Sequence, residues 1–214
     1  MKKYLCLSLL SLLFVDHASA QTKTYLTCGL INYSYKSKSE VLAKKKANSF
    51  FFGVEVDRYV SYHYAIATGA IYIRGGYDNG PSKWDNHFIQ VPLGIKAASL
   101  GEVLGITTGV NFNYLVKSTL HEVCDTLNNY VTTDVTRAFH RIQPDFFFAI
   151  IIRLKRITIG IKPSLSLTNR YSTKVKDITD KNACYYGSWY AYVLGKDQKL
   201  KATAFQFSLS VRMF

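Results

Sequence analysis

The chain has 214 residues, a single-domain length, and no linker-like stretch or solenoid-period repeat divides it. The formal net charge is +13, but the chain begins like an exported protein, which favours a membrane surface or lipopolysaccharide phosphates over nucleic acid as the anionic partner. Aromatic residues are abundant, yet no apolar run after the N-terminal segment is long enough to span a membrane as a helix, which excludes a helical membrane protein.

The first twenty residues have the three parts of a secretory signal peptide. Lys2 and Lys3 form the positive region, residues 5–15 the short apolar region, and residues 18–20 a small-residue cleavage site. A membrane anchor is the alternative, but this apolar run is shorter than the roughly 20 residues that a spanning helix needs. We therefore expect residues 1–20 to be cleaved and residues 21–214 to form the mature domain.

Eight later segments are predicted to be strands, because each is near the roughly 9–11 residues that a tilted barrel strand requires. The segments are Thr24–Tyr35, Ser49–Tyr59, Tyr62–Arg74, His87–Ala97, Val103–Val116, Phe139–Arg153, Ile157–Asn169 and Leu200–Met213. The seventh alternates most regularly, with Ile157 and Ile159 on one face and Thr158 and Lys162 on the other. The first and third are too evenly apolar for their faces to be assigned.

The connections between these segments alternate in length. The long ones are residues 36–48, 75–86, 117–138 and 170–199, and the short ones are 60–61, 98–102 and 154–156. A soluble β-sandwich or lipocalin-like barrel is the alternative, but it rarely shows this asymmetry. The sequence predicts an all-β fold, a closed antiparallel up-and-down transmembrane β-barrel of about eight strands, with short periplasmic turns and long extracellular loops.

The region from Phe51 to Leu115 carries several recognisable pieces, of which Ile89-Gln90-Val91-Pro92-Leu93 is the most specific, since proline inside a strand removes a ladder donor. The other pieces are Phe52-Gly53-Val54-Glu55, Ala67-Thr68-Gly69-Ala70-Ile71-Tyr72 and Thr108-Gly109-Val110-Asn111. Together they resemble the PorT-like outer-membrane β-barrel domain family. The resemblance implies a small barrel of a Gram-negative-type envelope, with secretion or envelope proteins as possible partners.

The chain ends on an aromatic residue, Phe214, one residue out of phase with Phe205 and Phe207. Bacterial outer-membrane barrels often end in this way. The resemblance implies recognition by the barrel-insertion machinery.

An eight-stranded barrel has an interior just wide enough to be filled by side chains. We expect its inward polar residues to form an ionic and hydrogen-bonded plug, because an unpaired buried charge is expensive. A gated ion path is the alternative. The inward candidates are Glu55, Asp57, Lys96, Asp145, Lys162 and Arg212, together with Asn111, Asn113, Gln143, Arg153 and Gln206.

Two cysteines fall in neighbouring long loops. Cys124 lies in the third and Cys184 in the fourth, so an oxidising envelope favours a disulfide between them. Cys28 lies in the first strand and is interpreted as a small apolar residue.

The fourth long loop is rich in aromatic residues mixed with lysines. Exposed aromatics beside charge are typical of a recognition surface, but the segment could instead be a packed hairpin extending the barrel. The candidates for this binding surface are Tyr185, Tyr186, Trp189 and Tyr190.

Catalytic and metal-binding patterns are weak. His121-Glu122 begins like a zinc-protease motif, but Asp125 stands where the second histidine should be. Asp85 and His87 have no identifiable nucleophile, and we expect no metal or cofactor.

The predicted function is a non-enzymatic outer-membrane barrel with a structural, binding or envelope-assembly role through its loops. A lipid-modifying enzyme and a narrow channel are the alternatives.

Overall fold

Nine strands and one short 3-10 helix form the part of the chain that the computed structural model describes, residues 21–36, 46–78, 82–98, 103–123, 130–170 and 201–213. The strands are β1 (Thr22–Lys36), β2 (Lys46–Tyr59), β3 (Tyr64–Asp78), β4 (Ser82–Ala98), β5 (Leu104–Val123), β6 (Tyr130–Asp134), β7 (Ile142–Leu154), β8 (Ile157–Ser166) and β9 (Lys201–Arg212), and the helix is η2 (Thr136–Ala138). In the described residues, no helix has the length and apolar character needed to cross a membrane.

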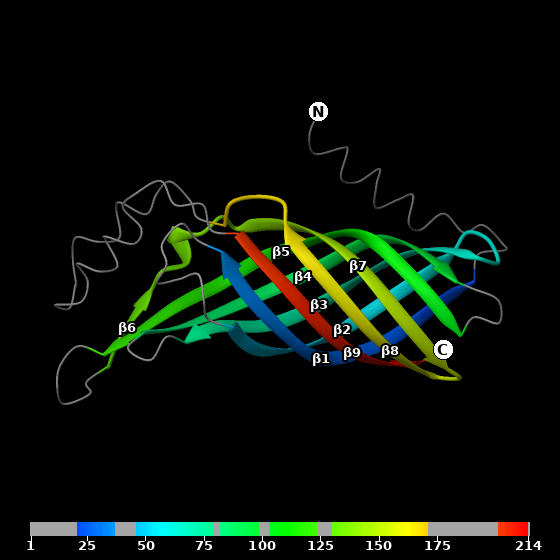
Figure 1. The fold of residues 1–214 in the computed structure, drawn as a ribbon, viewed down its shortest axis with the longest axis horizontal. Helices are drawn as coiled ribbons and strands as arrows, with labels where there is room; N and C mark the ends of the chain where they lie inside the picture. The colour runs from blue at the N-terminus through cyan, green and yellow to red at the C-terminus, as the bar shows by residue number, and fades with distance from the viewer. Residues whose placement is uncertain are drawn as a thin grey trace.

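The strands close into a ring in which every neighbouring pair is antiparallel. β1 pairs with both β2 and β9, so that Leu26 lies opposite Val54 on one side and Val211 on the other. β4 pairs with β5, β5 with β7, and the remaining neighbours follow in order. Eight strands therefore form the barrel, and β6 pairs with the end of β5 outside the ring (Figure 1). The predicted closed eight-stranded antiparallel barrel is confirmed.

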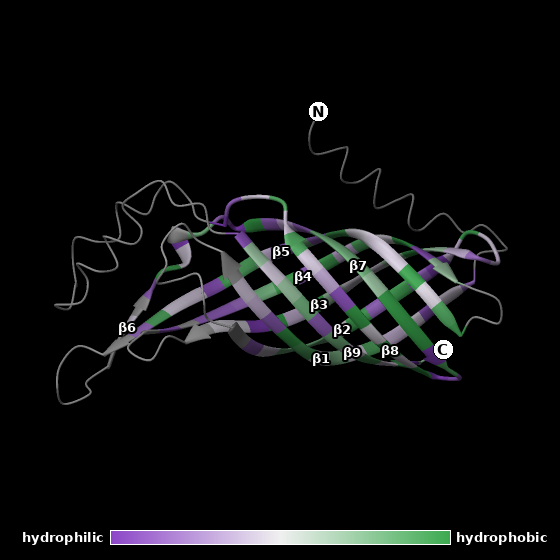
Figure 2. Cartoon of the chain, in the orientation of Figure 1, coloured by the Kyte–Doolittle hydropathy of each residue, from purple (hydrophilic) through white to green (hydrophobic). Residues whose placement is uncertain are grey.

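Successive residues of each strand face opposite sides of the wall, and most of the large apolar ones face outward. In β1, Leu30 is 65% exposed and its neighbour Ile31 is 1% exposed. In β8, Ile157, Ile159 and Ile161 are exposed, whereas the residues between them are buried. Alternating hydrophobic and hydrophilic bands along the strands are visible in Figure 2. An apolar exterior around a polar interior is typical of barrels that span membranes.

The two ends of the barrel differ. At the short-turn end, β2–β3, β4–β5 and β7–β8 are joined, and the last of these joins is a two-residue turn in which Lys155 has a φ of 54°. The opposite end, here called the long-loop end, includes the connection from β8 to β9 across residues 167–200. The C-terminal end of β9 lies at the short-turn end (Figure 1).

Several predicted boundaries are wrong at the long-loop end. Residues 75–86 were expected to be a long loop, but β3 and β4 continue through most of them. β5 likewise runs to Val123, and β6 lies within another predicted loop. β7 begins at Ile142 rather than Phe139, and β8 ends at Ser166 rather than Asn169. The ladder can continue past the apolar band because polar cross-strand pairs replace the apolar ones.

Candidate functional site

The interior near the short-turn end holds a cluster of buried charges, here called the short-turn layer. Lys96 Nζ of β4 donates to Asp57 Oδ2 of β2 at 2.5 Å, and Arg153 Nη2 of β7 lies 3.8 Å from the same oxygen. The ring of Tyr25 lies 5.3 Å from the ammonium of Lys96 and 5.9 Å from the guanidinium of Arg153. Three strands on different sides of the ring thus meet through one carboxylate.

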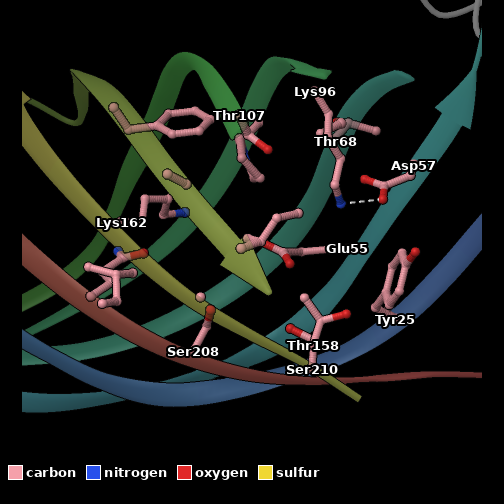
Figure 3. A pocket seen from close by; sticks show the side chains of 18 of the residues that line it. Tyr25, Glu55, Asp57, Thr68, Lys96, Thr107, Thr158, Lys162, Ser208 and Ser210 are labelled. Atoms are coloured by element: carbon pink, nitrogen blue, oxygen red, sulfur yellow. Dashed lines mark hydrogen bonds and ion pairs between the residues drawn. The ribbon is translucent and has the colours of Figure 1, made fainter. Parts of the chain in front are cut away.

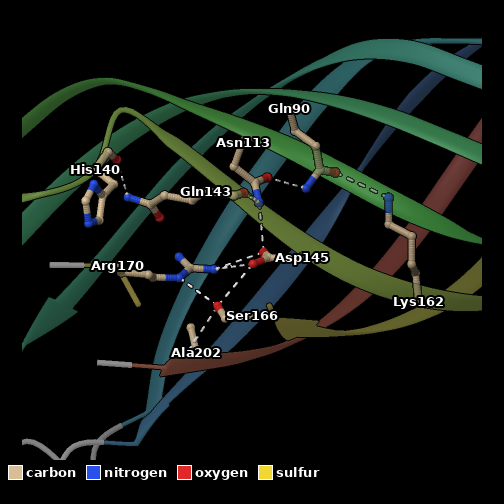
Figure 4. A network of polar contacts seen from close by, with 9 residues as sticks. All are labelled: Gln90, Asn113, His140, Gln143, Asp145, Lys162, Ser166, Arg170 and Ala202. Atoms are coloured by element: carbon tan, nitrogen blue, oxygen red, sulfur yellow. Dashed lines mark hydrogen bonds and ion pairs between the residues drawn. The ribbon is translucent and has the colours of Figure 1, made fainter. Parts of the chain in front are cut away.

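A second cluster, here called the long-loop layer, is centred on Asp145 of β7 (Figure 4). Its carboxylate accepts hydrogen bonds from Arg170 Nη2 at 2.9 and 3.2 Å, from Asn113 Nδ2 at 2.8 Å and from Ser166 Oγ at 3.0 Å. Arg170 is buried, and its guanidinium lies 5.8 Å from the ring of Tyr33. The buried carboxylate has a charge partner and two neutral donors, as a stable buried anion requires.

Ser166 connects this layer to both ends of the long β8–β9 connection. Its hydroxyl oxygen accepts hydrogen bonds from Arg170 Nε at 2.9 Å and from the backbone N–H of Ala202 at 3.2 Å. The carbonyl of Arg170 also accepts the backbone N–H of His140 at 2.9 Å. The segments that precede and follow residues 171–200 are therefore anchored at one point.

A chain of polar contacts leads from the long-loop layer to the middle of the barrel. Gln90 Nε2 donates to Asn113 Oδ1 at 2.7 Å, and Lys162 Nζ donates to Gln90 Oε1 at 3.3 Å (Figure 4). The ammonium of Lys162 also lies 5.0 Å from the centre of the Phe147 ring. A Cβ at position 94 would come within 2.9 Å of this ring, so Gly94 gives Phe147 the space to fill the interior.

Between the two layers lies a cavity of about 60 Å³, into which Glu55 and Lys162 point (Figure 3). At ~15 Å³ of such volume per water, it has space for about four water molecules. Thr158 Oγ1 and Gln206 Nε2 are buried at its wall without a protein partner, so water would satisfy them. The arrangement supplies a small chamber with polar wall groups, lying between two ion-paired layers.

The predicted inward residues can now be placed. Asp57 and Lys96 lie together in the short-turn layer, Asp145 lies in the long-loop layer, and Glu55 and Lys162 line the chamber between them. Arg212 stands near the end of β9, opposite Tyr25 of β1.

Sequence reasoning missed Arg170 and Ser166 as members of the long-loop layer. Arg170 was assigned to a loop, and it does lie past the end of β8. The inward alternation of Lys162 and Ser164 does not lead to it, because Thr168 is exposed.

Several candidate residues lie outside the described part of the chain. They are the cysteines Cys124 and Cys184 and the aromatic residues Tyr185, Tyr186, Trp189 and Tyr190. Cys28 is described, and its free thiol is exposed on the outer face of β1.

The two histidines considered for catalysis lie outside the lumen. His87 Nδ1 is 2.5 Å from the hydroxyl of Tyr72, and His87 Nε2 is 3.8 Å from Asp85. His121 Nδ1 is 3.0 Å from the hydroxyl of Thr132. Among the described residues, no group of three His, Cys, Asp or Glu side chains is arranged to hold a metal ion.

Solved structures with the same architecture are small outer-membrane barrels. The attachment invasion locus protein Ail of Yersinia pestis, crystallised with the heparin analogue sucrose octasulfate, matches with a TM-score of 0.52 at 8% identity, over 90% of this chain and 99% of that one. Neisserial surface protein A matches with the same TM-score, 0.52, at 8% identity and with the same coverage, 90% and 99%. No protein-family model and no curated protein matches the sequence. The fold is that of the small eight-stranded outer-membrane barrels.

Proposed function

We propose that the protein is a non-enzymatic integral outer-membrane barrel whose sealed body holds extracellular segments in place for binding or envelope assembly. One observation carries the proposal: two layers of buried ion pairs occupy the interior of a barrel whose exterior is apolar. Because the interior is filled in this way, binding or envelope assembly would take place on the surfaces outside the lumen.

The exterior supports a membrane location. Aliphatic residues cover much of the outside of β4, as in Val91, Leu93 and Ile95. Tyr62 and Tyr64 are exposed at the short-turn end. The other outward aromatics lie between the middle of the strands and the long-loop end and include Phe50, Phe52, Tyr114, Phe146, Phe148, Phe205 and Phe207. An apolar band between two aromatic girdles is what a barrel presents to a bilayer.

The proposal includes an orientation and a set of partners. The short-turn end faces the periplasm and the long-loop end faces outward, with lipopolysaccharide around it. The aromatic segment of residues 185–190 is the proposed binding surface, tied to the third loop by a Cys124–Cys184 disulfide. The barrel-insertion machinery and, through the PorT-like resemblance, secretion or envelope proteins are the proposed cellular partners.

The contacts of the histidines support a role without catalysis. A lipid hydrolase of the serine type needs a serine hydroxyl within hydrogen-bond reach of its histidine. Among the described residues, the hydroxyl that contacts His87 belongs to Tyr72 and the one that contacts His121 belongs to Thr132.

The test is to fractionate membranes of the native host and to run the protein unboiled and boiled on a gel, with and without reductant. We expect it in the outer-membrane fraction with a mobility shift on boiling, and a further change on reduction. Purified protein should also release no fatty acid from phospholipid vesicles. A soluble protein without the shift, or a lipid hydrolysis abolished by His87→Ala or His121→Ala, contradicts the proposal.

A further inference from the structure

Three basic residues form a row across the outer face near the long-loop end. Arg74 of β3 is the direct cross-strand partner of His87 of β4, and His87 is the direct partner of Lys117 of β5. All three face outward; Arg74 and Lys117 are exposed, and 27% of the His87 side chain is accessible. Direct cross-strand partners have Cβ atoms about 5 Å apart, so the row is compact.

A β-bulge brings Lys117 to this face. In β5 the odd-numbered residues from Thr107 to Leu115 face inward, and an unbroken ladder would turn Lys117 inward too. The register shifts instead between His87 and Phe88, so that Leu115 lies opposite Phe88 and Lys117 opposite His87. Val116 is the extra residue, and Lys117 becomes exposed. Bulges are commonly used to re-aim a side chain beside a functional site.

Arg141 supports the bulge and adds a second cation there. Its Nη1 donates to the carbonyls of Leu115 and Val116, each at 2.9 Å. The same geometry places its guanidinium next to the bulge that turns Lys117 outward. Two cations are thus held on the outside of β5, one of them by hydrogen bonds to the bulge itself.

The nearby carboxylates are already engaged. Asp85 accepts hydrogen bonds from Arg74, the shortest being 2.7 Å. Asp134 accepts both the hydroxyl of Thr136 at 2.5 Å and its backbone N–H at 2.9 Å. No described residue accepts a hydrogen bond from Lys117, although Asp134 lies within electrostatic range of both Lys117 and Arg141. Lys117 and Arg141 are like charges next to one bulge, so the pair favours an added anion.

The height of the row indicates which anion. One step closer to the middle of the barrel, the outward residues Phe52, Tyr72, Ile89 and Tyr114 are cross-strand partners in one row. Aromatic girdles lie at the membrane–water interface, which puts the basic row directly above them among the lipid headgroups. The Tyr72–His87 hydrogen bond joins the two rows and fixes the orientation of the imidazole.

We propose that Lys117, His87 and Arg141 form a site for the phosphate of an anionic lipid headgroup in the outer leaflet. The site rests on the proposed function, because it requires the barrel to be embedded with its long-loop end outward. Lys117 supplies an ammonium that no described residue hydrogen-bonds, Arg141 supplies guanidinium donors beside it, and His87 and Arg74 border the phosphate on the β3–β4 side. The ligand class is a phosphorylated lipid such as lipid A.

The experiment titrates full-length refolded protein in detergent with phosphorylated lipid A and with the same lipid after phosphatase treatment, using native mass spectrometry. The variants are Lys117→Gln, Lys117→Arg and, as a matched control, Lys201→Gln, an exposed lysine at the same end of the barrel on β9. We expect Lys117→Gln to bind phosphorylated lipid A about tenfold more weakly, since one charged contact is worth about that factor. Lys117→Arg and Lys201→Gln should bind as wild type does.

Equal weakening by Lys117→Gln and Lys201→Gln would overturn the site, since it would mean a general charge effect. Equal binding of the dephosphorylated lipid would overturn it as well. Heat-modifiability of each variant shows that the barrel has folded. A wild-type protein that lacks the heat shift or the outer-membrane location refutes the proposed function, whereas a folded outer-membrane barrel with unchanged Lys117→Gln affinity refutes this site alone.

Discussion

The two charged layers lie in the same barrel interior but are built differently. In the short-turn layer every member, Asp57, Lys96 and Arg153, comes from a barrel strand, and the ladder fixes its position. In the long-loop layer Asp145 comes from a strand, but its charge partner Arg170 lies four residues past Ser166, the last residue of β8. The first layer is therefore positioned by the barrel strands alone. The second layer links the barrel to the segment that enters the β8–β9 connection.

The largest effect is expected from Asp57→Ala. It leaves Lys96 and Arg153 buried near each other without the carboxylate, and breaking a buried ion pair on one side costs about 3–5 kcal/mol. Urea unfolding of the protein in detergent micelles measures the change in free energy. The double variant Asp57→Asn/Lys96→Met should recover part of the loss, because it removes one of the unpaired charges. A single-variant loss below that of Ser166→Ala would contradict the assignment of a rigid layer.

A smaller loss is expected from Arg170→Ala, about 2 kcal/mol, because Asp145 keeps Asn113 and Ser166 as donors. The same urea titration gives the value. Arg137→Ala, which removes an exposed arginine of η2, is the control and should change stability little. If Arg170→Ala proves as damaging as Asp57→Ala, the two layers do not differ in the way described.

Ser166→Ala should cost about 1 kcal/mol, the worth of a neutral hydrogen bond, while loosening both ends of the β8–β9 connection. Hydrogen exchange should speed up at the amide of Ala202, which donates to the Ser166 hydroxyl. Ser164→Ala, at the next inward position of β8, is the matched control. Unchanged exchange at Ala202 would show that Ser166 is not the anchor.

The smallest expected effect is a pH dependence of the stability around η2, which lies outside the barrel. Hydrogen bonds from the hydroxyl and backbone N–H of Thr136 hold the pKa of Asp134 below its ordinary value, partly opposed by burial. A lowered pKa in the folded state means that the ionised carboxylate stabilises the segment above the unfolded pKa, and that this contribution is lost as pH falls through the folded pKa. Exchange protection around η2 should fall on acidification in wild type but not in Asp134→Asn. An identical pH response in both would remove Asp134 as the cause.

The sequence predicted the parts of the fold that depend on alternation. The outward isoleucines of β8 and the inward positions of Asp57, Lys96 and Asp145 follow from a two-residue period that the bilayer and the lumen impose on opposite faces. The prediction of strand boundaries failed where polar residues continue the ladder beyond the apolar band, as in residues 75–86. Glycine, aspartate and asparagine there are also typical of loops.

Two features of the sites could not be read from local pattern. The bulge at Val116 reverses the face of Lys117, and only the pairing with His87 of β4 reveals it. Arg170 reaches Asp145 because β7 and β8 are neighbours in the ring, a long-range relation that residue spacing along the chain does not contain.

The most direct test of the central claim, a sealed interior, is single-channel recording of the pure protein in a planar lipid bilayer. Two ion-pair layers around a chamber of about 60 Å³ predict no reproducible current steps from wild type in symmetric salt. Reproducible steps whose size changes in Lys162→Gln, at the wall of the chamber, would show that ions pass through the lumen and would contradict the account.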